Sequence, residues 1–324
     1  MTNEEIIKAT IAELSKEPNW QERYAKYANS ILKHTEYYKE MAGKAHVSFP
    51  LSAYTTISKL KKSSCEYDIR YLGQSIGSLE IRETGERIFG YSNGYTDLRA
   101  KQGYTMLPLL EKIEKWDSKN MTKCRSILKH IDVFDAKTHS PEHKCENLLL
   151  REFSKEKSKD KSFLYIQPVR FAGKFVQFTT NLTASKKNEV TYSKKGGGID
   201  ILARVGVGAN SHLCVFELKD ENHDSEPMEV VLQQALSYAV FLALLLDDSR
   251  AKDWWKVLGY NGKTEPIHTI DVVGLMPKGK ETIGENEYKV GSFSLRTHTL
   301  YFDKDALFNQ EKFHFSGSFA EMLK

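Results

Sequence analysis

The pattern of apolar and polar positions divides the chain into a helical start, a β-rich middle and a mixed second half. Residues 3–44 carry apolar side chains at helical spacing with Pro18 as an interruption, so we predict two helices there. Three alternating runs then predict an antiparallel β-meander: Tyr67–Leu72, Gly77–Ile81 and Arg87–Tyr91. Helical spacing returns over Met106–Ile131.

The second half mixes helices and strands. A helix is predicted at Glu142–Lys155 and a long helix from Pro227, a favourable first-turn residue, to Leu246. The predicted strands are Phe163–Phe178, with an interruption at Gly173, Gly198–Val205, His212–Lys219 and Ile267–Met276. This order predicts an α/β class with a mixed sheet of the α+β kind rather than a uniform βα alternation.

Length and composition narrow the class of protein. A chain of 324 residues favours two domains, and we place the boundary near residue 136, giving units 1–135 and 136–324. With 40% hydrophobic and 28% charged residues, the composition argues against a disordered or fibrous chain. The four cysteines show no paired C-x-x-C spacing, which favours free thiols over disulfides or a zinc site.

Targeting signals and net charge say little about the function of the chain. No secretory signal is visible at the start, and the longest apolar stretch, Ala239–Leu246, is too short to cross a membrane, so we expect a cytoplasmic protein without a membrane partner. A formal charge of +4 permits nucleic-acid binding without establishing it.

The chemically informative stretch runs from Gly196 to Asp224. Side chains alternate along a strand, so Glu217 and Lys219 share one face. If Gly206–Ser211 connects two antiparallel strands, Val205 faces His212, and the same register sets Asp200 opposite Glu217. We therefore expect two carboxylates and a lysine to gather at one place.

Two neighbouring carboxylates require a positive partner if both are to stay ionised. Lys219 and a divalent cation can supply it, and oxygen ligands favour Mg²⁺ or Mn²⁺. Asp200 and Glu217 would hold the metal, while Lys219 would position a water or stabilise charge on a phosphate. This arrangement suits phosphodiester hydrolysis.

These residues carry a family resemblance. Ile199-Asp200, sixteen intervening residues and Glu217-Leu218-Lys219 resemble the active-site pattern of the PD-(D/E)XK nuclease superfamily, with Ile199 where the family motif has Pro. The resemblance covers about residues 140–280 and implies a restriction-endonuclease-like core. The separate helical and β-meander domain predicted for residues 1–135 lies outside the resemblance. The resemblance also implies a Mg²⁺-dependent nuclease.

Two further elements resemble the same superfamily. Gln234-Ala235-Leu236-Ser237-Tyr238 resembles the Q-x-x-x-Y helix of its exonuclease-like branches, which places Gln234 and Tyr238 near the active site and substrate. Glu146 matches a helix glutamate that assists the metal in many members, with Glu142 and Glu152 as alternatives. Both elements have a structural explanation as well. Glu146 lies near a helix start, where the helix dipole favours Glu. Gln234 and Tyr238 could form hydrogen bonds at the edge of a hydrophobic core.

Basic and glycine-rich segments flank the active-site strand. Lys186-Lys187 and Lys194-Lys195 suit phosphate contacts, although a solvated loop explains them equally well. Gly196–Gly198 would let the backbone approach a nucleic acid or turn tightly into the strand.

The functional hypothesis is a metal-dependent nuclease that acts on DNA, with restriction or phage defence as the setting that the resemblance implies. Residues 1–135 would serve recognition, dimerisation or regulation, and a homodimer is consistent with paired active sites. Two alternatives stay open: a noncatalytic nucleic-acid-binding or assembly module with a nuclease fold, and an RNA-directed nuclease.

Overall fold

The computed structural model describes residues 1–57, 64–91, 115–130, 141–154, 165–184, 190–193, 196–220, 226–262, 266–277 and 283–323. The described chain forms two compact units that alternate along the sequence. The first unit contains Met1–Asn29, Leu148–Val169 and Phe178–Lys324, and the second contains Ser30–Asn147 and Arg170–Gln177. The predicted boundary near residue 136 lies outside the described residues.

The helical start has the predicted interruption. Helix α1 (Asn3–Ser15) ends before Pro18 and α2 (Trp20–Lys44) begins after it. Thr2 caps α1 by accepting a hydrogen bond from the Glu5 amide, and the Glu5 side chain accepts one from the Thr2 amide in return. In the first unit, α1 packs on the long helix α7 (Met228–Asp247).

The second unit is built on an antiparallel meander. Strands β2 (Ser64–Tyr71), β3 (Gln74–Arg82) and β4 (Arg87–Tyr91) pair in sequence order, which confirms the three predicted strands. The strand β1 (Leu51–Thr56), which the sequence pattern did not reveal, pairs with β2 on the other side. Helix α5 (Ser118–His130) falls within the predicted helical region, and the earlier part of that region lies outside the described residues.

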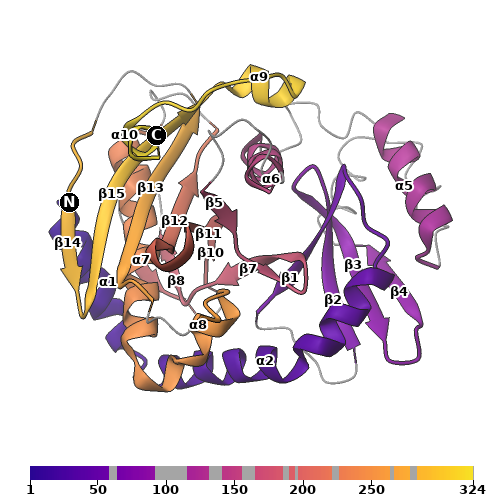
Figure 1. The fold of residues 1–324 in the computed structure, drawn as a ribbon, viewed down its shortest axis with the longest axis horizontal. Helices are drawn as coiled ribbons and strands as arrows, with labels where there is room; N and C mark the ends of the chain where they lie inside the picture. The colour runs from indigo at the N-terminus through magenta and orange to yellow at the C-terminus, as the bar shows by residue number, and fades with distance from the viewer. Residues whose placement is uncertain are drawn as a thin grey trace. The chain divides into compact units, whose positions relative to one another are not determined.

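The first unit contains a six-stranded mixed sheet in the order β14-β15-β13-β12-β11-β5 (Figure 1). The strands are β5 (Ile166–Pro168), β11 (Ile201–Val205), β12 (His212–Leu218), β13 (Thr269–Pro277), β14 (Glu287–Val290) and β15 (Phe293–Phe302). Strands β12, β13 and β15 run parallel, and the other pairs are antiparallel. The predicted mixed α/β class is confirmed, whereas the restriction-endonuclease-like core stays a prediction.

The remaining elements complete this description. The helices are α6 (Pro141–Phe153), α8 (Asp253–Val257), α9 (Lys304–Asn309) and α10 (Ser318–Met322). The short strands are β6 (Arg170–Phe171), β7 (Lys174–Thr179), β8 (Leu182–Ala184), β9 (Val190–Tyr192) and β10 (Gly198–Ile199). The turn between β6 and β7 contains Gly173, where the sequence predicted an interruption.

Helix α7 is the apolar centre of the first unit. By length and composition alone it could cross a membrane, but 83% of its most apolar window is buried inside the protein. A buried core helix passes the same test, so the helix by itself does not indicate a membrane span.

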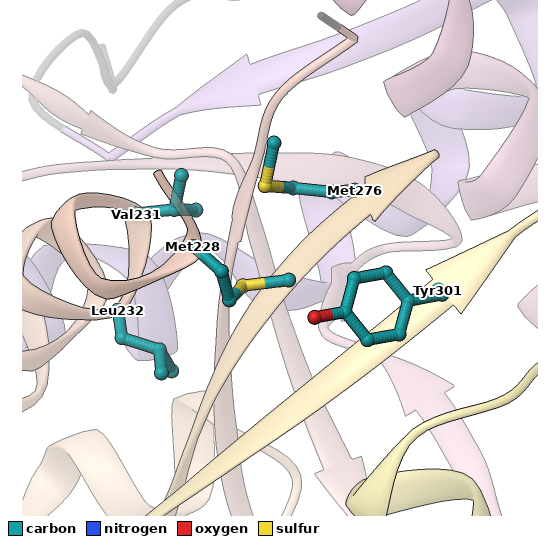
Figure 2. Close-up of a cluster of buried hydrophobic side chains, with 5 residues drawn as sticks. All are labelled: Met228, Val231, Leu232, Met276 and Tyr301. Carbon is teal, nitrogen blue, oxygen red and sulfur yellow. The ribbon is translucent and has the colours of Figure 1, made fainter. Parts of the chain in front are cut away.

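The start of α7 is fixed on the sheet by an apolar cluster. Figure 2 shows Met228 reaching from the helix toward Tyr301 of β15, with Met276 of β13 beside them. A Cβ atom on Gly274 of β13 would lie 2.4 Å from the Met228 sulfur. The helix therefore approaches this part of the sheet closely because residue 274 has no side chain.

Candidate active site

The hairpin that carries the candidate site has the register predicted from the sequence. Val205 of β11 pairs with His212 of β12, and the ladder continues to Ile201 opposite Phe216. The next step of the same register would set Asp200 opposite Glu217. The regular pairing stops just before it, because Asp200 lies in a bend between β10 and β11.

The bend turns the Asp200 carboxylate toward the end of β12. Its Oδ2 atom accepts a hydrogen bond of 2.8 Å from the backbone amide of Leu218. Leu218 stands between Glu217 and Lys219 in the sequence. The carboxylate of Asp200 is thus fixed at the tripeptide that carries the other two predicted residues.

Glu217 and Lys219 form a buried ion pair. The Lys219 Nζ atom lies 2.7 Å from Glu217 Oε1 and also donates to the Leu218 carbonyl at 3.0 Å. Only 6% of the Glu217 side chain and 11% of the Lys219 side chain are exposed. A charged pair in this setting interacts more strongly than one in water, because less solvent screens it.

Tyr238 lies within the electrostatic field of these residues. Burial raises the pKa of the Tyr238 hydroxyl, and the negative charges of Glu217 and Asp200 raise it further, against smaller opposing effects that include the positive charge of Lys219. Tyr238 therefore stays a neutral hydroxyl at physiological pH. The predicted association of Tyr238 with the carboxylates is consistent with this interaction.

Gly197 gives the Tyr238 hydroxyl its place. A Cβ atom on Gly197 would lie 2.7 Å from Tyr238 Oη and 2.8 Å from the Leu182 carbonyl oxygen. Both distances are too short for a real side chain. Close packing thus explains a glycine at position 197. The sequence predicted instead that the run Gly196–Gly198 approaches a nucleic acid or turns tightly into the strand.

Gln234 bonds to a carboxylate that the sequence analysis did not select. Its Nε2 atom donates to Glu226 Oε1 at 2.7 Å, and both side chains are buried. Glu226 lies just before α7, two residues after the end of the Gly196–Asp224 stretch. Nothing in its sequence context distinguishes it from a surface glutamate.

Glu146 belongs to the second unit. There its Oε1 atom lies 3.7 Å from Arg70 Nη1, and its Oε2 atom lies 3.6 Å from His143 Nδ1. Arg70 also bonds to Asp68 at 2.7 Å. The participation of Glu146 in a metal site with Asp200 and Glu217 stays a prediction.

No preassembled cluster of three or more His, Cys, Asp or Glu side chains suited to a metal ion is found among the described residues. The lysine pairs 186–187 and 194–195, which we predicted as phosphate contacts, lie outside the described residues. In the described hairpin, Asp200 and Glu217 are the two predicted metal-binding carboxylates, and both lie beside Leu218.

Comparison with known proteins brings no further information. No protein-family model, curated protein or solved structure matches this chain. The resemblance to the PD-(D/E)XK superfamily therefore rests on the motif residues themselves.

The same sheet contains a second ionic cluster around Asp271 of β13. This fully buried carboxylate lies 2.6 Å from His212 Nε2, 2.7 Å from Arg296 Nη2 and 3.3 Å from His298 Nε2. Burial alone would raise the pKa of Asp271, but its contacts with His212 and His298 and the charge of Arg296 lower it well below its usual value. Because Arg296 and two histidines surround this buried carboxylate, we interpret the cluster as structural.

Proposed function

We propose that this chain is a metal-dependent nuclease whose active site contains Asp200, Glu217 and Lys219. The observation that supports it best is the bond from the Leu218 amide to Asp200 at 2.8 Å, beside the 2.7 Å pair of Lys219 and Glu217. These two contacts join two carboxylates and one lysine at the ends of neighbouring strands. The three side chains carry one more negative than positive charge when ionised.

The donor set fits a hard divalent cation. Mg²⁺ binds through one or two carboxylates and keeps several waters, whereas a structural zinc ion needs four protein ligands. Each carboxylate has two oxygens, so the bonds to Leu218 and Lys219 are compatible with a further cation. Asp200 and Glu217 would hold Mg²⁺ or Mn²⁺, which when bound would acidify a water and polarise a phosphate.

The protein's own residues have separate roles in this proposal. The Leu218 amide orients Asp200, and the sheet on both sides of β12 holds Glu217. Lys219 would stabilise negative charge that develops on the phosphate, as a preorganised cation in a poorly solvated site does. Tyr238 would bond as a neutral hydroxyl donor rather than as a base.

The substrate of this proposal is DNA. The site residues address the phosphate group and do not read the 2′-hydroxyl, so the choice between DNA and RNA depends on other parts of the protein. A role in restriction or phage defence and a homodimeric assembly rest on the family resemblance alone.

Plasmid cleavage tests the proposal. We expect the wild-type chain to nick or linearise supercoiled DNA with Mg²⁺ or Mn²⁺ and to lose this activity in EDTA. Asp200→Asn should abolish cleavage, because the amide cannot hold the cation as a carboxylate does. Glu287→Gln, which changes an exposed glutamate of the same sheet, is the control and should cleave normally.

The result separates the alternatives. Cleavage of a matched RNA but not DNA would identify an RNA-directed nuclease. Absence of cleavage on both, together with no heat of Mn²⁺ binding by calorimetry, would overturn the proposal in favour of a noncatalytic module. Normal cleavage by Asp200→Asn would eliminate the assigned site.

A further inference from the structure

The sheet ladder beside the candidate site ends at a proline. The Lys219 amide donates to the Leu275 carbonyl of β13 at 3.0 Å. In a parallel ladder the Lys219 carbonyl would then accept from the amide of residue 277. Residue 277 is Pro277, which has no N–H to donate. The regular hydrogen bonding between β12 and β13 therefore cannot continue past Lys219.

At the next residue, Asp220, the backbone is bonded by a lysine side chain instead of by a neighbouring strand. Lys304 Nζ donates to the Asp220 carbonyl oxygen at 3.1 Å and lies 3.4 Å from Asp220 Oδ2. Lys304 follows the end of β15, whose last residue, Phe302, pairs with Pro277. The cation thus comes from the first residue of α9, just after the strand on the far side of β13, and reaches the end of β12.

Three consecutive residues after Glu217 are each held by a different element. The Leu218 amide bonds to Asp200, the Lys219 amide bonds to Leu275, and Asp220 bonds to Lys304. The Lys304 contact is a charge-assisted hydrogen bond, which is stronger than a neutral one. Asp220 and Lys304 are also partly shielded from solvent, with 11% and 31% of their side chains exposed.

We propose that Lys304 is a positioning residue of the candidate site, which fixes the end of β12 through Asp220 and thereby holds Lys219 against Glu217. The inference rests on the proposed function for its catalytic consequence. Its structural part does not depend on that function. No role in contacting the substrate is assigned to Lys304.

Hydrogen exchange tests the structural part. Lys304→Met keeps the apolar stem and removes the ammonium, so exchange of the Lys219 amide should become about tenfold faster, as loss of a hydrogen bond to a charged group predicts. Lys304→Arg restores a cationic donor and should return exchange toward the wild-type rate. Lys256→Met, which removes an exposed ion pair with Asp253 on α8, should leave this amide unchanged.

Cleavage kinetics test the catalytic part. At saturating metal, Lys304→Met should lower kcat about tenfold with little change in KM, and Lys304→Arg should recover most of it. Asp220→Asn keeps the carbonyl contact and should show a smaller loss, which provides a second variant if Lys304→Met fails to fold.

The outcomes for the two proposals are distinguishable. Wild-type exchange in Lys304→Met, or faster exchange that Lys304→Arg does not reverse, would overturn the positioning role whatever the activity. Faster exchange with undiminished cleavage would overturn the catalytic consequence. An inactive wild-type protein whose Lys219 amide still responds to Lys304→Met would count against the proposed function and would support the structural role.

Discussion

The first unit contains two Glu-x-Lys tripeptides on strands of one sheet, and they differ in almost every physical respect. Glu217-Leu218-Lys219 ends the central strand β12, with 6% of the Glu217 side chain and 11% of the Lys219 side chain exposed. Glu287-Tyr288-Lys289 lies in the edge strand β14, where the same side chains are 55% and 72% exposed. The two tripeptides therefore share a sequence pattern but differ in burial and in their place in the sheet.

The companions of the two glutamates explain the difference. The central tripeptide has a second carboxylate, Asp200, bonded to its own backbone, and Lys219 lies 2.7 Å from Glu217. In the edge tripeptide, Glu287 accepts a hydrogen bond from the Ser294 hydroxyl and lies 3.3 Å from Lys289. The first arrangement gathers negative charge where a cation could bind, whereas the second is an ordinary solvated pair.

The largest expected effect comes from removing the central lysine, Lys219, and not its counterpart Lys289. We expect Lys219→Met to lower kcat for plasmid cleavage by about 10²–10³-fold, the usual loss when one preorganised charge-stabilising donor is removed. Lys289→Met, at the matched position of the edge tripeptide, should cleave at the wild-type rate. Single-turnover cleavage at saturating Mg²⁺ measures both.

The stability of Lys289→Met shows whether this variant is a suitable control. Lys289→Met should change the free energy of unfolding by less than about 0.5 kcal/mol, because surface substitutions usually do. Equal losses of cleavage in the two variants would break the comparison. That result would mean that the position of a Glu-x-Lys tripeptide in the sheet does not determine whether its lysine is needed for cleavage.

The second effect concerns the space beside the central tripeptide. Gly274 pairs with Glu217, and a Cβ atom there would lie 2.4 Å from the Met228 sulfur. Gly274→Ala should therefore cost about 1–3 kcal/mol of unfolding free energy by overpacking, as urea denaturation would measure. Gly284→Ala, where a Cβ atom would meet nothing within 4 Å, is the matched control. A loss no larger than that of the control would show that α7 is not closely packed at this point.

The sequence predicted the strand register at the candidate site through local patterns. The length of the Gly206–Ser211 loop and the alternation of β12 were sufficient for the register, which the pairing of Val205 with His212 confirms. The apolar spacing of α7 predicted that helix for a similar reason, since its period is a local property. The bond from Leu218 to Asp200 was not predictable, because it depends on the bend between β10 and β11.

The contacts that sequence reasoning missed connect residues far apart in the chain. Lys304 lies 84 residues from Asp220, and its role depends on the order of strands in the sheet. Strands β14 and β15 were not predicted at all, although β15 supplies the neighbour of β13. The alternation of the two compact units likewise comes from tertiary packing, which a linear pattern of hydrophobicity does not contain.

The smallest effect concerns the acid titration of the edge tripeptide. The Ser294 hydrogen bond, and after it the bond and charge of Lys289, lower the pKa of Glu287 below its usual value of 4.5. Since the folded pKa is lowered, the associated stability is present above the usual value and is lost as the pH falls through the folded pKa. Carboxyl titration by NMR should show that Ser294→Ala raises the Glu287 pKa more than Lys289→Met does. Added salt should weaken the Lys289 contribution, because that pair is exposed. If Lys289→Met instead caused the larger rise, the ion pair rather than the hydroxyl would dominate at the edge, and the two tripeptides would differ less than their surroundings indicate.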